Sequence, residues 1–226
     1  SLFNAHGGKF IYASSAATYG AEEKDFAERI DGLKPTNAYG FLKLHFDKWI
    51  SKNEEPARNF IGLRFFNVYG PGEKFKGDMA SVVHKALNKS KPIHAYKNNP
   101  PECKGDIDCA WHLFQSEREG VNSEAIRRDF VYVEDVCKVI WHFIQNKAES
   151  GIYNLGSGKA RSFHDIVRIV DSSIPIKLIP MPNSIKSHYQ YFTQANLTKL
   201  RAAGYKEEFT SLEDGIKKMK EQIKWK

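Results

Sequence analysis

The chain has 226 residues, of which 41% are hydrophobic and 13% aromatic, and this composition indicates a folded globular protein of one or two domains. It contains no apolar run approaching the roughly 18 residues that a membrane-spanning helix needs, so we expect no membrane partner. The 34 basic and 27 acidic residues give a net charge of +7. No compact basic patch alternates with stacking aromatics, so we discount nucleic acid and favour a polyanionic small substrate.

The three cysteines suit a reducing compartment better than a disulfide framework, and we expect a cytoplasmic protein. Cys103, Cys109 and His112 are conceivable metal ligands, but their spacing matches no common zinc pattern. We therefore expect free thiols and no metal site.

The first predicted elements form a β–α–β unit. An apolar strand pattern at residues 9–13 runs into Ser14 and Ser15, and turn and N-cap residues at 35–37 precede a helix that carries Tyr39 and Lys43. Residues 60–66 form an almost continuous apolar run, which indicates a parallel strand covered on both faces. The sequence therefore predicts an α/β fold, with a ligand-binding loop at residues 67–72, after the second strand.

The remaining elements are predicted from their apolar spacing and flanking turn residues. Residues 79–90 are expected to be helical, and residues 96–127 to be an irregular polar stretch. The later pattern predicts strands at 130–133, 152–155 and 176–179, with helices from 134 to about 146, after Ser162, and around Leu212, Ile216, Met219 and Ile223.

Tyr39 and Lys43 are spaced so that they share one face of a helix. A tyrosine that acts as a base near pH 7 needs its anion stabilised by about 4 kcal/mol, and a neighbouring ammonium supplies part of that. Ser15 could hydrogen-bond the same substrate oxygen from the end of the first strand. The pair alone is weak evidence, because an amphipathic helix with a half-buried tyrosine has the same spacing.

Five stretches in order along the chain strengthen that interpretation, and on them the sequence resembles the extended short-chain dehydrogenase/reductases that act on nucleotide sugars. These stretches are residues 12–20, 39–43, 64–71, 128–133 and 153–158. Four segments make it most similar to the ADP-glyceromanno-heptose 6-epimerases within that family: residues 14–19, 76–81 (Lys-Gly-Asp-Met-Ala-Ser), 189–195 and 200–205.

The resemblance implies the C-terminal part of a Rossmann-type doubly wound parallel sheet plus a smaller α/β substrate domain. Residues 1–66 and 128–151 would belong to the dinucleotide-binding domain, and residues 67–127 and 152–226 mainly to the substrate domain. Compared with the family, residues from about Lys97 to Ala110 are expected to be an insertion.

The resemblance also implies an epimerase that inverts C6 of the heptose through a 6-keto intermediate. Tyr39 and Lys76 would be the two acid/base groups, Lys43 would hold the nicotinamide ribose and support Tyr39, and Ser15 would orient the reacting oxygen. Cofactor contacts would come from Tyr39, Lys43, Val68 and Lys76, and substrate contacts from Ser15, Asn67, Phe114, Ser116, Arg128 and Tyr189. Without the resemblance, Lys76 could be an ordinary exposed lysine, Asn67 a turn cap, and Arg128 a strand-edge partner of Asp129.

The expected cofactor is NADP, with NAD as the alternative, and the expected assembly is a homo-oligomer, a pentamer by resemblance. No G-x-x-G-x-x-G turn follows any predicted strand, although this family binds the dinucleotide pyrophosphate at such a turn. We therefore expect the C-terminal part of a longer enzyme, with roughly 100 residues absent. The alternatives are another nucleotide-sugar epimerase or dehydratase, and a non-catalytic remnant.

Overall fold

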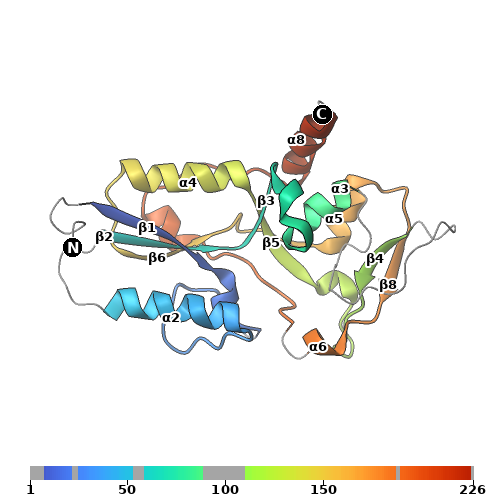
Figure 1. The fold of residues 1–226 in the computed structure, drawn as a ribbon, viewed down its shortest axis with the longest axis horizontal. Coiled ribbons are helices and arrows are strands. Elements are labelled where there is room, and N and C mark those ends of the chain that lie inside the picture. Colours follow the sequence, from blue (N-terminus) through green and yellow to red (C-terminus); the bar gives the residue numbers. More distant parts are fainter. Residues whose placement is uncertain (1–7, 22–24, 53–58, 89–109, 187–188, 225–226) are drawn as a thin grey trace.

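The computed structural model describes residues 8–21, 25–52, 59–88, 110–186 and 189–224. Their strands form three small sheets (Figure 1). Most of the expected insertion, and with it Cys103 and Cys109, lies outside the described residues.

The first sheet contains three parallel strands in the order β1 (Lys9–Ser15), β2 (Asn59–Phe65) and β6 (Gly151–Leu155). Helix α2 (Ala38–Lys52) covers one face of this sheet and helix α4 (Val133–Gln145) covers the other (Figure 1). The middle strand is the continuously apolar one, because both of its faces are buried. The predicted β–α–β unit, β1–α2–β2, is confirmed.

The second sheet joins β3 (Asn67–Tyr69), β5 (Arg127–Tyr132) and β7 (Ala160–Ser162). Strand β3 runs parallel to β5, so the prediction of a loop directly after the second strand was wrong for its first three residues. The backbone of these residues finds hydrogen-bond partners on a strand some 60 positions later, and no local pattern signals such a distant pairing.

The third sheet is a parallel pair of β4 (Trp111–Phe114) and β8 (Ile176–Ile179). Strand β4 and the short 3₁₀ helix η3 (Ser123–Ala125) lie within residues 96–127, so the prediction of an irregular stretch was wrong there. Strand β8 was predicted.

The remaining elements are short helices and one longer C-terminal helix. The predicted helix at 79–90 is shorter, since α3 begins after its cap, Ser81. Helix α8 buries Leu212, Ile216 and Met219 as its spacing predicted. These elements are η1 (Ala16–Tyr19), η2 (Glu73–Met79), α3 (Val82–Leu87), α5 (Phe163–Val170), α6 (Asn183–Lys186), α7 (Thr198–Ala202) and α8 (Leu212–Lys224).

Strand β5 connects the two largest hydrophobic cores. Phe130 and Tyr132 belong to the core that contains Trp111 and Phe163, whereas Val131 belongs to the core of the first sheet, with Leu63. Successive side chains of a strand point to opposite faces, so one short strand serves both cores.

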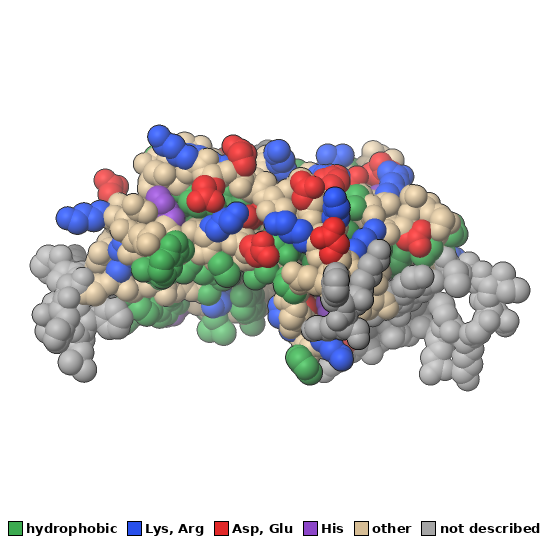
Figure 2. All heavy atoms as spheres, turned by 90° about the horizontal axis from the view of Figure 1, so that it is seen from above, with side chains coloured by type: hydrophobic (Ala, Val, Ile, Leu, Met, Phe, Trp, Pro, Cys, Tyr) green, Lys and Arg blue, Asp and Glu red, His purple; other side chains and the backbone are tan. Residues whose placement is uncertain are grey.

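The surface on the α4 side carries basic and acidic side chains interspersed with one another rather than segregated by sign (Figure 2). Within the described part of the chain, no helix is long and apolar enough to cross a bilayer.

Candidate functional site

Ser15 is the last residue of β1, where the strand passes directly into η1. Its hydroxyl accepts a hydrogen bond from the backbone N–H of Ala17 at 3.1 Å, and its carbonyl accepts one from the Thr18 hydroxyl at 2.8 Å. These contacts fix the strand end and hold the Ser15 side chain at the carboxyl edge of the parallel sheet. Ligands bind at that edge in open α/β folds.

Tyr39 and Lys43 lie on the first two turns of α2, beside the same strand end. The Lys43 ammonium donates to the Ala13 carbonyl of β1 at 2.8 Å and lies 5.7 Å from the centre of the Tyr39 ring. The Tyr39 side chain remains 56% exposed. The structure therefore places a cation beside an accessible phenol, and the carbonyl that this cation contacts belongs to Ala13, two residues before Ser15 on β1.

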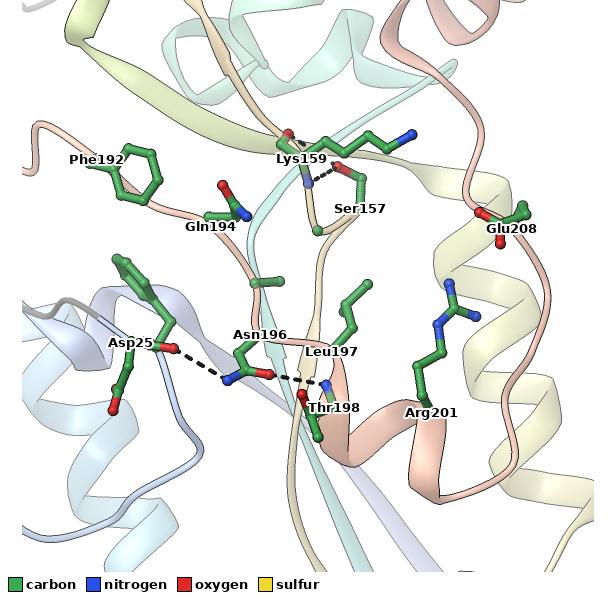
Figure 3. Close-up of a pocket in the computed structure, with 13 residues that line it drawn as sticks. Asp25, Ser157, Lys159, Phe192, Gln194, Asn196, Leu197, Thr198, Arg201 and Glu208 are labelled. Carbon is green, nitrogen blue, oxygen red and sulfur yellow. Dashed lines mark hydrogen bonds between the residues drawn. The ribbon is translucent and has the colours of Figure 1, made fainter.

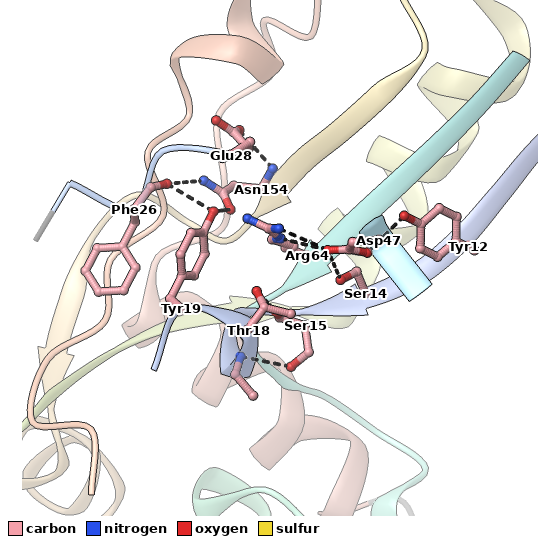
Figure 4. A network of polar contacts seen from close by, with 11 residues as sticks. Tyr12, Ser14, Ser15, Thr18, Tyr19, Phe26, Glu28, Asp47, Arg64 and Asn154 are labelled. Carbon is pink, nitrogen blue, oxygen red and sulfur yellow. Dashed lines mark hydrogen bonds and ion pairs between the residues drawn. The ribbon is translucent and has the colours of Figure 1, made fainter. Parts of the chain in front are cut away.

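A buried salt bridge attaches α2 to the sheet (Figure 4). The Asp47 carboxylate accepts hydrogen bonds from Arg64 Nε at 3.1 Å and Nη2 at 3.0 Å, and from the hydroxyls of Tyr12 and Ser14, both at 2.9 Å. Burial and the Asp47 charge raise the pKa of the Tyr12 hydroxyl well above its usual range, so it stays a donor. Sequence reasoning missed this cluster, although Asp47 continues the four-residue spacing of Tyr39 and Lys43.

The polar network continues across the sheet to the loop that precedes α2 (Figure 4). Tyr19 donates to the Asn154 side chain at 2.6 Å and to the Phe26 carbonyl at 3.1 Å, and its ring faces the Arg64 guanidinium at 4.8 Å. Burial raises the pKa of Tyr19 to about 12. Phe26 itself has a positive φ of 46°, an unusual conformation for a bulky residue. Its carbonyl accepts hydrogen bonds from the Tyr19 hydroxyl and from Asn154 Nδ2, the latter at 2.7 Å, and these two donors hold it in place.

The predicted second acid/base group lies on a different element. Lys76 belongs to η2 and keeps 56% of its side chain exposed, with its ammonium 3.6 Å from the Glu73 carboxylate. Asn67 and Val68 begin β3, immediately beyond the end of β2. Because Ser15 pairs with Phe65 at the end of β2, Asn67 follows close to the same strand edge. The Asn67 side chain is exposed and that of Val68 is half-buried.

Arg128 and Tyr189 form a stacked pair in the second part of the molecule. The Arg128 guanidinium lies 5.0 Å from the Tyr189 ring and 5.9 Å from the Phe163 ring, and it donates to the Arg127 carbonyl at 3.0 Å. Burial lowers the pKa of Arg128, and Tyr189 opposes this shift. These contacts are all with other protein groups, so the substrate role of both residues stays a prediction.

The alternative reading of Arg128, an ion pair with Asp129, is not what the structure shows. Neighbouring residues of a strand point to opposite faces. The Asp129 carboxylate instead accepts hydrogen bonds from Ser157 N at 2.6 Å, Gly158 N at 2.8 Å and Ala195 N at 2.9 Å. Burial raises the pKa of Asp129 to about 6, and these donors oppose the shift.

Phe114 and Ser116 end up in different surroundings from those expected of ligand contacts. Phe114 is 4% exposed and packs edge-to-face against Tyr189, so it supports that ring from behind. The Ser116 hydroxyl accepts the N–H of Arg118 at 3.3 Å within its own loop. A direct substrate contact stays a prediction for both residues.

A groove of about 900 Å³ was not anticipated from the sequence (Figure 3). Segments around Phe26, Ser157–Lys159 and Phe192–Arg201 line it. It contains none of the predicted site residues, and its lining mixes acidic, basic and apolar side chains. It therefore adds no chemistry to the site at the end of β1.

The residues at the end of β1 fit one end of a nicotinamide cofactor. Lys43 is a cation with donors beside an accessible phenol, the kind of group that binds ribose hydroxyls. The described residues include no glycine-rich turn between a strand and a helix to receive the pyrophosphate. They also contain no group of three or more His, Cys, Asp or Glu side chains placed to hold a metal ion.

Comparison with known proteins identifies the family of the chain. The ADP-L-glycero-D-manno-heptose-6-epimerase of Fusobacterium nucleatum is 42% identical over 224 aligned residues, which cover 92% of this chain and 63% of that relative. The crystal structure of the Helicobacter pylori ADP-L-glycero-D-manno-heptose-6-epimerase has a TM-score of 0.71 and 29% identity, covering 99% of this chain and 62% of that one.

A Thermus thermophilus UDP-glucose 4-epimerase in complex with NAD has a TM-score of 0.68 at 22% identity, with 98% of this chain and 66% of that one covered, and shows the shared Rossmann-like fold. The chain thus spans just under two thirds of the length of these three relatives. The sequence model of the NAD dependent epimerase/dehydratase family matches residues 1–156, more than half of the chain. The chain belongs to the NAD dependent epimerase/dehydratase family.

Proposed function

We propose that this chain supplies the proton-transfer residues of an epimerase that inverts C6 of the heptose in ADP-glycero-manno-heptose. The 42% identical Fusobacterium relative bears that name, which supports the substrate. The observation that carries the proposal is the Lys43 ammonium, which donates to the Ala13 carbonyl of β1 and lies 5.7 Å from the centre of the Tyr39 ring.

The chemistry follows from the substrate. C6 of the heptose is a carbinol carbon with no acidic neighbour, so its C–H bond cannot be broken by proton removal alone. A nicotinamide cofactor supplies the acceptor, and later the donor, of the hydride. Tyr39, as phenolate, removes the hydroxyl proton from one side while Ser15 holds the oxygen, and a 6-ketone results. After the ketone turns, the Lys76 ammonium returns a proton to the oxygen from the other side.

We propose NADP as the cofactor, with NAD as the alternative, held at its nicotinamide-ribose end by Tyr39, Lys43, Val68 and Lys76. The 226 residues contain no glycine-rich pyrophosphate turn. The cofactor should therefore bind tightly only when a polypeptide that carries such a turn is joined to this chain. The 226-residue chain alone is expected to be inactive.

The substrate would contact Ser15, Asn67, Arg128 and Tyr189, with Phe114 and Ser116 behind or beside them. A guanidinium suits a diphosphate, because it donates two parallel hydrogen bonds. We further propose a cytoplasmic homo-oligomer, a pentamer, that serves the heptose supply for lipopolysaccharide. The division into a nucleotide domain (1–66, 128–151) and a substrate domain (67–127, 152–226) is part of the same proposal.

The test uses a hybrid chain in which the part of the Fusobacterium relative that this chain does not match is fused ahead of residue 1. The hybrid chain is incubated with one C6 epimer of ADP-glycero-manno-heptose, and the products are identified by NMR. Formation of the other C6 epimer supports the proposal. Inversion at another carbon, or loss of water, would instead identify a different epimerase or a dehydratase of the family.

A hybrid chain that folds, binds NADP and leaves every nucleotide sugar unchanged would favour a non-catalytic remnant. Binding is the control that separates this outcome from a failed fusion. It is measured as calorimetric heat on titration with NADP.

A further inference from the structure

Glu73 is an acidic residue whose carboxylate is almost completely buried within a loop, with 3% of the residue exposed. Its oxygens accept hydrogen bonds from both ends of that loop: from Gly70 N at 3.1 Å, Ser81 N at 2.6 Å and Ser81 Oγ at 2.7 Å. Burying a carboxylate is costly unless hydrogen bonds satisfy it, so these three donors keep it in place. Glu73 therefore clamps residues 70–81 into a closed loop.

The far end of the loop is fixed to the next helix. The same Ser81 hydroxyl accepts the N–H of His84 at 3.1 Å and thereby caps α3. Within the loop η2 is kinked at Gly77, whose φ of 52° suits glycine, and Ala80 N donates to the Gly77 carbonyl at 3.1 Å. The loop is thus held at its base and kinked at Gly77, and Lys76 directly precedes that kink.

Lys76 forms an ion pair with the Glu73 carboxylate. Its ammonium lies 3.6 Å from Glu73 Oε2, while 56% of its side chain faces solvent. Other charged groups in this region of the described structure are Lys74, Asp78 and Lys85. Lys85 interacts electrostatically with Glu73 and Asp78, and its ammonium donates to the Asp78 carbonyl at 2.7 Å. The Glu73 carboxylate is the negative charge closest to Lys76.

We infer that Glu73 is the positioning residue of Lys76: it fixes the loop from Gly70 to Ser81 and presents the Lys76 amine as a paired ammonium. This inference rests on the proposed function, in which Lys76 donates a proton to the ketone oxygen. A proton donor on a surface loop needs a defined place. The buried Glu73 carboxylate supplies it, because its hydrogen bonds fix the backbone and one of its oxygens lies 3.6 Å from the Lys76 ammonium.

The test is competitive acetylation of lysines with limiting N-hydroxysuccinimidyl acetate, with the rate at each lysine read by mass spectrometry. Lys74 is exposed on the same loop and serves as the internal reference. In Glu73→Gln the ratio of Lys76 to Lys74 acetylation should rise about two- to fivefold, the range for loss of one partly exposed ion pair. The matched control Asp78→Asn removes a charge from the same loop and should leave the ratio unchanged.

An unchanged ratio in Glu73→Gln would overturn the inference. So would an equal rise at both lysines, since that would reduce Glu73 to a backbone clamp. If Glu73→Gln does not fold, the unaltered chain still decides: raising the salt from 10 mM to 1 M screens the ion pair and should raise the Lys76 to Lys74 ratio. A ratio that ignores salt contradicts the pairing.

The labelling experiment needs neither cofactor nor substrate, so it is independent of the epimerase proposal. If the hybrid chain is active but Glu73→Gln leaves the ratio of Lys76 to Lys74 acetylation unchanged, only the inference about Glu73 is disproved. If Glu73→Gln raises that ratio but the hybrid chain is inactive, the proposed function is disproved and the pairing of Glu73 with Lys76 stands.

Discussion

Asp47 on α2 and Arg64 on β2 form a salt bridge of 3.0 Å in which both side chains are fully buried. The same carboxylate accepts hydrogen bonds from Tyr12 and Ser14 of β1. Asp47 follows Tyr39 and Lys43 at four-residue intervals, so all three lie along one side of α2. The ion pair therefore fixes the rotation of the helix, and with it the direction in which Tyr39 and Lys43 face.

Replacing one member of this pair should be strongly destabilising. In Asp47→Asn the Arg64 guanidinium becomes a buried charge without its counter-ion, and the free energy of unfolding should fall by about 3–5 kcal/mol. Urea unfolding followed by circular dichroism measures this change. The double variant Asp47→Leu/Arg64→Met removes both charges and should recover part of the loss. A single-variant loss below about 1 kcal/mol would show that the pair does not hold the helix.

The raised pKa of Asp129 predicts that the stability of the protein falls as the pH rises. Burial raises its pKa to about 6, above the value of 3.8 in the absence of shifts. A raised folded-state pKa stabilises the protein at low pH, and this stabilisation is lost as the pH rises through about 6. Relative to Asp129→Asn, the unaltered chain should lose roughly 2 kcal/mol of unfolding free energy between pH 4 and pH 7.

Asp129→Asn serves as the control, because it keeps every other titrating carboxylate and lacks only the one at position 129. The hydrogen bond from Arg161 lowers the pKa of Glu213, and, against the effect of burial, hydrogen bonds from the Ser162 backbone and from Arg161 lower the pKa of Asp165; both contributions cancel in the difference. A difference between the two proteins that does not change with pH would show that the Asp129 pKa is not raised.

The isolated 226-residue chain should not bind NADP measurably. Lys43 and Tyr39 offer contacts for the nicotinamide ribose alone, while most dinucleotide affinity in this kind of fold comes from the pyrophosphate turn. Isothermal titration calorimetry at protein concentrations near 100 µM (roughly the range that detects millimolar dissociation constants) checks this. Saturable heat with micromolar affinity would disprove the expectation.

Tyr39→Phe should separate chemistry from stability. The Tyr39 side chain is 56% exposed, so removing its hydroxyl should change the free energy of unfolding by less than about 0.5 kcal/mol. In the hybrid chain the same change should lower the epimerisation rate by about 100-fold or more, because the base is gone. Replacing Tyr12, whose hydroxyl binds Asp47, is the matched comparison: Tyr12→Phe should destabilise the fold and leave Tyr39 in place.

The sequence predicted the first sheet well because its strands are continuous apolar runs and its helix has clear start signals. Strands β3 and β4 were missed for a physical reason. They contain three and four residues, and each is a strand only because a distant segment pairs with it. An alternation of apolar and polar residues over three or four positions does not distinguish a strand from a loop.

The site could be predicted only where a motif has fixed spacing. Tyr39 and Lys43 are four residues apart, and the structure places the Lys43 ammonium 5.7 Å from the centre of the Tyr39 ring and 2.8 Å from the Ala13 carbonyl of β1. Asp47, Arg64 and Glu73 could not be recognised, because buried and exposed charges look alike in a sequence. Their roles depend on partners from other elements, which only the folded chain brings together.

The substitution Lys76→Met in the hybrid chain tests the central claim most directly. Epimerisation at C6 is followed by NMR, and cofactor binding is measured in the same sample. Epimerisation should fall by about 100-fold or more with NADP still bound, because the second proton donor is lost while the fold is kept. Undiminished C6 epimerisation by Lys76→Met would contradict the account.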